Sequence, residues 1–274
     1  MSRRTKEILF HAFISLIGLI WILPLLYLFF TALKPHADFY SRSIIALPAS
    51  IRWANFGDAW NRAGLGIYIK NSLVISIIKV PLGILIEALA AFALTRLYFK
   101  HKNLIFMFFL VGMMLPMQVT LVPLNSLLNK MNLINTYTGI FIIYLGFGLS
   151  YGILILRGFM RTIPIEIDES ARIDGCSDLR LFWNIILPIA KPAVVTLLIM
   201  DFLATWNEFL LSSLFLTRNN MRTIPSGLMT FFGQYGVDYT LLSAAVLITI
   251  IPVLVLFLHF QKYFVEGLVG AVKG

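Results

Sequence analysis

Long apolar stretches alternate with short polar connections along the whole chain. Six of these stretches reach the ~20 residues that an α-helix needs to cross about 30 Å of hydrocarbon. They cover residues 8–33, 69–95, 104–127, 137–160, 185–211 and 241–264. The pattern therefore predicts an all-α integral membrane protein, with six transmembrane helices in one domain over residues 1–274.

The first stretch is predicted to stay in the protein as a helix, because it exceeds the ~7–15 apolar residues of a signal-peptide core. Pro116 and Pro123 interrupt the third stretch, which we expect to be kinked or broken. Pro188 and Pro192 lie near the start of the fifth.

The composition supports a membrane protein. Hydrophobic residues make up 59% of the chain and charged residues 13%, against about 45–50% and about 25% in soluble domains. The net charge of +9 comes from basic residues scattered over short connections. That distribution favours anionic lipid over nucleic acid as the partner. Cys176 is the only cysteine, and the four histidines have no ligand spacing, so no metal site is expected.

The basic residues also predict the orientation. With Lys262 and Lys70 counted from the ends of their stretches, twelve lysines and arginines lie on the side of the N-terminal arm, the 96–102 turn, the 157–184 segment and the tail, and eight lie on the other side. Short basic connections face the cytoplasm. We therefore expect both termini and the segment between the fourth and fifth stretches, residues 161–184, to be cytoplasmic.

The 161–184 segment is unusually acidic for this chain. Five of the thirteen acids lie within thirteen residues: Glu166, Asp168, Glu169, Asp174 and Asp178. Pro164 suits the first turn of a helix, Gly175 suits its left-handed end, and Ser177 can cap a second short helix. These residues alone leave two interpretations open, a docking surface and a simple connection between spans.

Motifs of nucleotide binding and hydrolysis are missing from the sequence. It contains no Gly-x-x-x-x-Gly-Lys-Ser/Thr phosphate loop, no His-Glu-x-x-His and no Gly-x-Ser-x-Gly. We therefore expect that the chain is not an enzyme and has no cofactor of its own. Any energy must come from an ion gradient or from another subunit.

The 161–184 segment and the residues after it contain a spaced motif. Glu169-Ser170-Ala171 is followed after three residues by Gly175, and after nine more by Ile185-Ile186-Leu187-Pro188. This run resembles the cytoplasmic motif of ABC importer permeases, which has Ala where this chain has Ser170. Two further runs, Trp206-Asn207-Glu208-Phe209 and Phe264-Val265-Glu266-Gly267, resemble the carbohydrate-uptake, maltose-permease-like branch.

The resemblance implies a type I importer fold in which the 161–184 segment forms a coupling helix on a cytosolic ATPase. It assigns coupling to a set of motif residues: Glu169, Ser170, Ala171, Arg172, Asp174, Gly175, Leu187 and Pro188. The implied partners are a second permease subunit of a different chain, two ATPase subunits that bind ATP and Mg, and an extracytoplasmic solute-binding protein. The implied location is the cytoplasmic membrane of a bacterium or archaeon.

Polar residues inside membrane spans usually face the bundle interior or a water-filled path. The candidates for a substrate path are Gln118, Tyr151, Trp206, Asn207 and Glu208, because aromatic faces with amide and carboxylate groups suit sugars. Contacts between helices are the alternative role for these residues. Glu87 and Asp201 are further intramembrane acids, and both are candidate proton carriers.

The resemblance implies import of a sugar or oligosaccharide. Within the same class, a glycerophosphodiester or polyol derivative is the alternative cargo. An ion-coupled secondary transporter using Glu87 or Asp201 is the rival class, although the internal repeats usual there are not evident. A non-transporting scaffold would not explain the prolines and polar residues in the spans.

Overall fold

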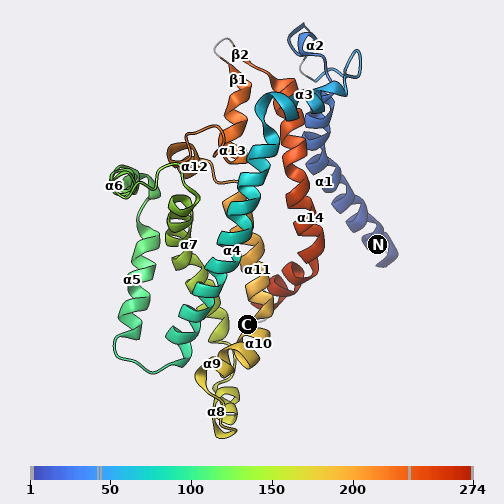
Figure 1. Ribbon diagram of the computed structural model, residues 1–274. Coiled ribbons are helices and arrows are strands. Elements are labelled where there is room, and N and C mark those ends of the chain that lie inside the picture. The colour runs from blue at the N-terminus through green and yellow to red at the C-terminus, as the bar shows by residue number, and fades with distance from the viewer. Residues whose placement is uncertain (1–2, 42, 44, 234–235, 273–274) are drawn as a thin grey trace. The chain divides into compact units, whose positions relative to one another are not determined.

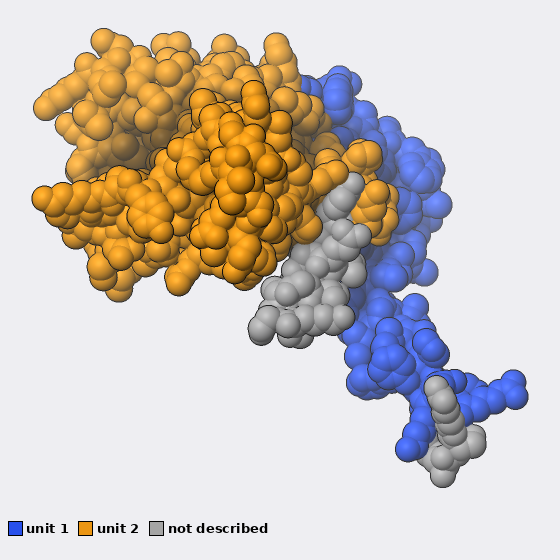
Figure 2. Space-filling view, turned by 90° about the horizontal axis from the view of Figure 1, so that it is seen from below, with its two compact units in different colours: residues 1–66, 227–251 blue, residues 67–226, 252–274 orange. Residues whose placement is uncertain are grey.

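The computed structural model describes residues 3–41, 43, 45–233 and 236–272, without the side chains of residues 3, 63 and 263–272. By internal contacts the chain divides into two compact units, coloured blue and orange in Figure 2. Unit 1 comprises residues 1–66 and 227–251, and unit 2 comprises residues 67–226 and 252–274. Each unit is described by itself.

Unit 1 contains the first long helix and a set of short elements. These are α1 (Arg3–Ala32), α2 (His36–Ser41), α3 (Ala54–Ala63), η2 (Leu228–Phe231), β1 (Phe232–Gly233), β2 (Gly236–Val237) and the first part of α14 (Tyr239–Val272). The two strands pair antiparallel. The Asn55 amide donates to the carbonyl oxygens of Ala32 and Lys34, both at 2.8 Å, and so fixes the end of α1 against α3.

Unit 2 contains the helices around the candidate site (Figure 1). They are α4 (Leu65–Arg96), α5 (Lys102–Met114), α6 (Met117–Lys130), α7 (Tyr137–Met160), α8 (Ile165–Ile173), α9 (Asp178–Leu181), η1 (Phe182–Ile186), α10 (Leu187–Ile189), α11 (Lys191–Trp206), α12 (Leu210–Phe215) and α13 (Ile224–Gly227). A buried cluster that includes Ile75, Ile143 and Phe215 joins α4, α7 and α12.

Four described helices are long and apolar enough to cross a membrane, and the count is six if each of two bent pairs forms one span. The four are α1, α4, α7 and the part of α14 up to Lys262. These helices cover the predicted stretches 8–33, 69–95, 137–160 and 241–264 to within a few residues. The most apolar part of α1 has no buried residue, as expected for a helix that faces lipid.

The stretches 104–127 and 185–211 are not straight helices. The chain bends by 99° between α5 and α6, where Leu115 and Pro116 are extended. Proline disfavours helical backbone at the residue before it, so the expected break in the third stretch is confirmed. A second bend of 76° lies at Ala190, between Pro188 and Pro192. The fifth predicted stretch is therefore bent near its start, and α11 ends at Trp206.

Two other boundaries differ from the sequence analysis. The sixth stretch continues as helix α14 to Val272, so its helix includes most of the tail. The side chains of that tail, including Glu266, lie outside the described residues. The connection after residue 33 contains two short helices, α2 and α3, and Gly64 ends α3 in the left-handed conformation with φ +66°.

Candidate functional site

Helix α8 is built by local signals in its sequence. Pro164 occupies the N-cap position, and Glu166 and Asp168 lie in the first turn, where the helix dipole favours negative charge. Gly175 has φ +78° at the other end. Its N–H donates to the Arg172 carbonyl at 3.0 Å, and the N–H of Cys176 donates to the Ala171 carbonyl at 2.9 Å. This pair of bonds is a Schellman ending, which confirms the predicted role of Gly175.

The second short helix of the segment is also capped as predicted. The Ser177 hydroxyl accepts the N–H of Arg180 at 3.4 Å, at the start of α9. Arg172 joins the two helices through an ion pair of 2.6 Å with Asp178. Both side chains of this pair are about half exposed, so it adds little stability.

The motif residues of α8 divide into a buried and an exposed set. Ala171 is buried and faces the protein. Five others are exposed: Glu169, Ser170, Arg172, Asp174 and Gly175. The Ser170 hydroxyl donates to the Glu166 carbonyl at 2.8 Å, so its polar group is satisfied within the helix. This bond explains how serine is accommodated where the resembling family has alanine. Leu187 and Pro188 lie in α10, before the bend at Ala190.

A buried arginine connects α8 to α4. Arg96, the last residue of α4, places its Nε 3.2 Å from Asp168 Oδ2 and donates from Nη2 to the Ile163 carbonyl at 2.7 Å. Burial raises the pKa of the Asp168 carboxyl, and Arg96 and Arg172 partly offset this rise. In Figure 1, α8 lies at the same end of unit 2 as the turn between α4 and α5.

From the sequence alone, Arg96 was only one charge in a basic turn, and its contacts with α8 and Ile163 were not predicted. Arg96 and Asp168 lie far apart in the sequence, and nothing in their spacing pairs them. The one signal for this pair was the position of an arginine at the end of a span, together with an acid in the 161–184 segment on the same predicted side of the membrane.

Unit 2 also has an open cavity of about 260 Å³ between helices α4, α7 and α11, which we call the membrane cavity. Tyr151 and Glu208, two of the predicted substrate-path residues, line it, together with Glu87 and Asp201. Lys79 pairs with Asp201 across the cavity wall. Trp206, Asn207 and Gln118 are not among the residues that line it.

The three consecutive residues Trp206, Asn207 and Glu208 have different surroundings. Trp206 is buried and stacks on Phe202 with ring centroids 5.4 Å apart. The Asn207 amide donates to the Leu203 carbonyl at 3.0 Å, within its own helix.

Glu208 accepts the hydroxyl of Tyr144 at 2.6 Å and caps α12 by accepting the N–H groups of Leu211 and Ser212, at 2.6 and 2.9 Å. Gln118 is exposed on α6. Of the predicted path, the structure thus brings only Tyr151 and Glu208 together at the membrane cavity.

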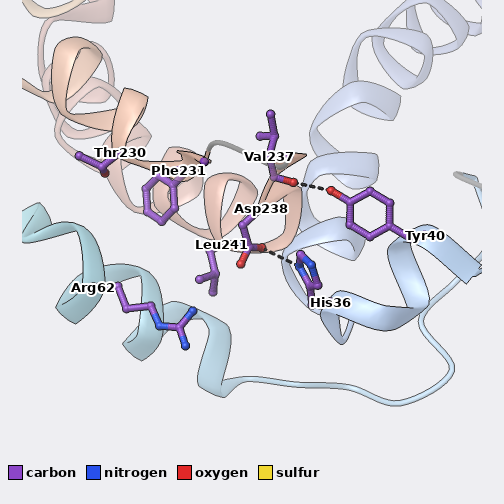
Figure 3. A pocket seen from close by; sticks show the side chains of 10 residues that line it. His36, Tyr40, Arg62, Thr230, Phe231, Val237, Asp238 and Leu241 are labelled. Carbon is purple, nitrogen blue, oxygen red and sulfur yellow. Dashed lines mark hydrogen bonds and ion pairs between the residues drawn. The ribbon is translucent and has the colours of Figure 1, made fainter.

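A second cavity, of about 560 Å³, lies within unit 1 between α2, α3 and the β1–β2 hairpin (Figure 3). The Tyr40 hydroxyl donates to the Val237 carbonyl at 2.5 Å, and His36 Nδ1 lies 3.3 Å from Asp238 Oδ1. Arg62 of α3 lines the same cavity. Sequence reasoning missed this cavity, because its residues come from two distant parts of the chain.

The Asp238 carboxyl is held in its ionised form. Burial alone would raise its pKa, but hydrogen bonds from the Leu241 N–H, the Thr240 hydroxyl and His36 bring the pKa below its usual value. A lowered pKa stabilises the fold at neutral pH, and this contribution is lost only as the pH falls through the lowered value.

Comparison with known proteins places these features in a family. Residues 79–268 match the family described as binding-protein-dependent transport system inner membrane component. The arabinooligosaccharides transport system permease protein AraQ of Halalkalibacterium halodurans is 34% identical over 284 aligned residues, which cover 100% of both chains. The diacetylchitobiose uptake system permease protein NgcG of Streptomyces coelicolor is 32% identical, over 95% of this chain and 87% of that one.

Among solved structures, a bacterial ABC transporter involved in the import of the acidic polysaccharide alginate has the same fold. The TM-score is 0.81 at 20% identity, covering 96% of this chain and 99% of that chain. The matched region contains α8, Arg96 and the membrane cavity. The chain belongs to the binding-protein-dependent transport system inner membrane component family, the permease subunits of ABC importers.

Proposed function

We propose that this chain is the membrane-spanning subunit of an ATP-driven importer that moves a sugar or oligosaccharide into the cell. An extracytoplasmic binding protein delivers the sugar, and a separate ATPase, which binds ATP and Mg, supplies the energy. The arabinooligosaccharide and diacetylchitobiose transport systems to which its relatives belong support a saccharide as cargo. The assembly contains a second permease subunit and two ATPase subunits, and both termini of this chain are cytoplasmic.

The observation that carries the proposal is the arrangement of α8. Its motif residues Glu169, Arg172 and Gly175 are exposed, while Asp168 on the same helix is fixed to Arg96 at the end of α4. A partner that binds the exposed face of α8 can therefore move α4. The same helix, α4, also carries Lys79 and Glu87 of the membrane cavity. This connection gives a path from ATP binding to the substrate.

Reconstitution of the whole assembly in proteoliposomes tests the proposal. We expect uptake of at least one of three neutral sugars, arabinotriose, maltotriose or N,N′-diacetylchitobiose, to require ATP and to survive a protonophore. A glycerophosphodiester serves as a further arm for the alternative cargo. Uptake that stops with the protonophore and continues without ATP would instead support ion-coupled transport through Glu87 or Asp201.

A further inference from the structure

Three basic residues lie where the beginning of α5 meets the end of α7, and we call them the basic patch. Lys102 is the first residue of α5, Arg157 lies in the last turn of α7, and Arg161 caps that helix. The two helices pack against each other in unit 2, and these two ends lie at the same end of it (Figure 1). The sequence around the patch, residues 96–107 and 151–165, contains no acid. The patch therefore has no opposite charge in its own segments.

Arg157 is oriented by an aromatic ring. Its guanidinium carbon lies 3.8 Å from the centroid of the Phe106 ring on α5, a stacked arrangement that suits arginine. Its Nε is buried, whereas its two Nη groups are not, and none of these donors has a hydrogen-bond partner among the described residues. A guanidinium stacked on a ring keeps its N–H groups at the edge, where two of them can bind two oxygens of one phosphate.

The contact between Arg157 and Phe106 sets the register of the two helices, which run in opposite directions (Figure 1). Lys102 precedes Phe106 by four residues and Arg161 follows Arg157 by four, so both lie one turn further toward the same end. Arg161 adds a second positive charge within electrostatic reach of Arg157. In the part of the chain that the structure describes, neither Lys102 nor Arg161 forms an ion pair. Like charges gathered without a carboxylate attract an anion from outside the chain.

The outer surface of α5 continues the patch with apolar side chains. None of the thirteen residues of α5 is buried, and Leu104, Met107 and Phe108 are all exposed. In a chain that spans a membrane, an exposed apolar surface of this kind faces lipid. Tyr98, whose ring lies 5.3 Å from Lys102 Nζ, is 97% exposed, and tyrosine is enriched at the level of the lipid headgroups. The basic patch therefore lies between an apolar, lipid-facing surface and the water.

We propose that the basic patch binds the phosphate of an anionic phospholipid, whose acyl chains lie along the outer surface of α5. Arg157 supplies paired N–H groups to two phosphate oxygens, and Lys102 and Arg161 supply further positive charge. Basic pockets between membrane helices are suited to such headgroups. A free phosphate ion offers the same chemistry but makes no use of the apolar surface. The site depends on the position of this chain in the membrane and is independent of its cargo.

Native mass spectrometry of the permease–ATPase complex tests the site, with phosphatidylglycerol and phosphatidylcholine of identical acyl chains as the two probes. We expect the wild-type complex to retain phosphatidylglycerol at least fivefold more than phosphatidylcholine, and excess inorganic phosphate should not displace it. Arg157→Gln should lower the number of retained phosphatidylglycerol molecules by one for each copy of this chain. Arg157→Lys keeps the charge but loses the planar pair of donors, and it should lower the preference at least threefold.

Arg180→Gln is the matched control, because it removes the same charge from an exposed arginine of α9 outside the patch. Its lipid retention should equal that of wild type. Equal retention of the two lipids by the wild-type complex, unchanged retention in Arg157→Gln, or displacement by inorganic phosphate would overturn the lipid site. If Arg157→Lys behaves as wild type, the oriented guanidinium is refuted.

An acidic side chain of another subunit is the competing occupant of the basic patch. A carbodiimide joins a lysine amine to a carboxylate that touches it, so it reports such a neighbour at Lys102 directly. We expect no cross-link from Lys102 to another subunit in the assembled complex. A cross-link at this residue, located by peptide mass spectrometry, would show a protein partner on the patch and overturn the proposal.

Discussion

At the scale of single residues, Arg96 holds α8 in place with two contacts. Its guanidinium pairs with the buried Asp168 and donates to the Ile163 carbonyl. Replacing it with alanine leaves a carboxylate buried without its partner, which typically costs about 3–5 kcal/mol. We expect Arg96→Ala to lower the thermal unfolding temperature in detergent and to reduce ATP-dependent uptake at least tenfold.

Arg172→Ala is the matched control for stability, because the Arg172–Asp178 pair is exposed. Its effect on unfolding should stay below about 1 kcal/mol. If the two variants unfold at the same temperature, Arg96 does not anchor α8.

The packing beside the membrane cavity leaves no room for a side chain at Gly152. A Cβ there would occupy the position of the Glu87 carboxyl group. Gly152→Ala must displace this buried acid, and overpacking of this kind costs about 1–3 kcal/mol. We expect a lower thermal unfolding temperature in detergent together with reduced ATP-dependent sugar uptake in proteoliposomes.

Gly158→Ala, on the same helix, is the control for this substitution. Its added Cβ meets no atom within 4 Å, and alanine favours helix over glycine by up to about 1 kcal/mol. The role of Gly152 is refuted if both variants behave alike.

At the scale of elements, α8 is the proposed docking helix, and its end depends on Gly175. Proline fixes φ near −65° and lacks the N–H that here bonds to the Arg172 carbonyl, whereas Gly175 has φ +78°. The Gly175→Pro variant should therefore insert normally into the membrane, but the exposed face of α8 should become disordered. We expect ATP hydrolysis to continue while sugar uptake falls at least tenfold, measured in the same proteoliposomes.

Glu169 tests the same element through charge. It is an exposed acid of the motif, and Glu169→Lys reverses its charge without touching the buried anchor at Asp168. We expect uptake to be uncoupled from ATP hydrolysis in this variant. Glu166→Lys reverses another exposed acid of α8 outside the motif, and it should retain coupling. Unimpaired uptake in Glu169→Lys would remove this residue from the docking surface.

The sequence predicted these elements to very different degrees. Hydropathy locates the long helices, and Pro164, Gly175 and Ser177 locate the ends of α8 and α9, because each acts on its own backbone. Pro116 predicted a break but not its angle of 99°, since packing of neighbouring helices sets the angle. The second bend at Ala190 was not predicted, although Pro188 and Pro192 flank it, because membrane helices tolerate prolines and their positions alone do not require a bend.

The site was less predictable than the elements. Lys79 and Asp201 lie more than a hundred residues apart, and only the packing of α4 on α11 makes them partners. In the same way, Glu208 was predicted in the substrate path, but the structure also uses its oxygens to cap α12. A polar residue in a span signals an interior position, whereas its partners depend on tertiary structure.

At the scale of the whole molecule, the orientation in the membrane can be tested with the single native cysteine. Cys176 follows Gly175 at the end of α8 and is partly exposed. The charge distribution predicts that this end of α8 faces the cytoplasm. A membrane-impermeant maleimide should therefore label Cys176 in inverted vesicles but not in intact cells or spheroplasts.

Docking of the ATPase adds a second expectation to the same measurement. Cys176 donates its N–H to the end of α8, so a partner bound to the exposed motif residues should cover it. We expect the ATPase to slow labelling in inverted vesicles severalfold, and Glu169→Lys to restore the faster rate. As the opposite-side control, Asn61→Cys on the exposed surface of α3, in a Cys176→Ser background, should react only from outside. Labelling of Cys176 from outside would reverse the orientation and place α8 beyond the reach of a cytosolic ATPase.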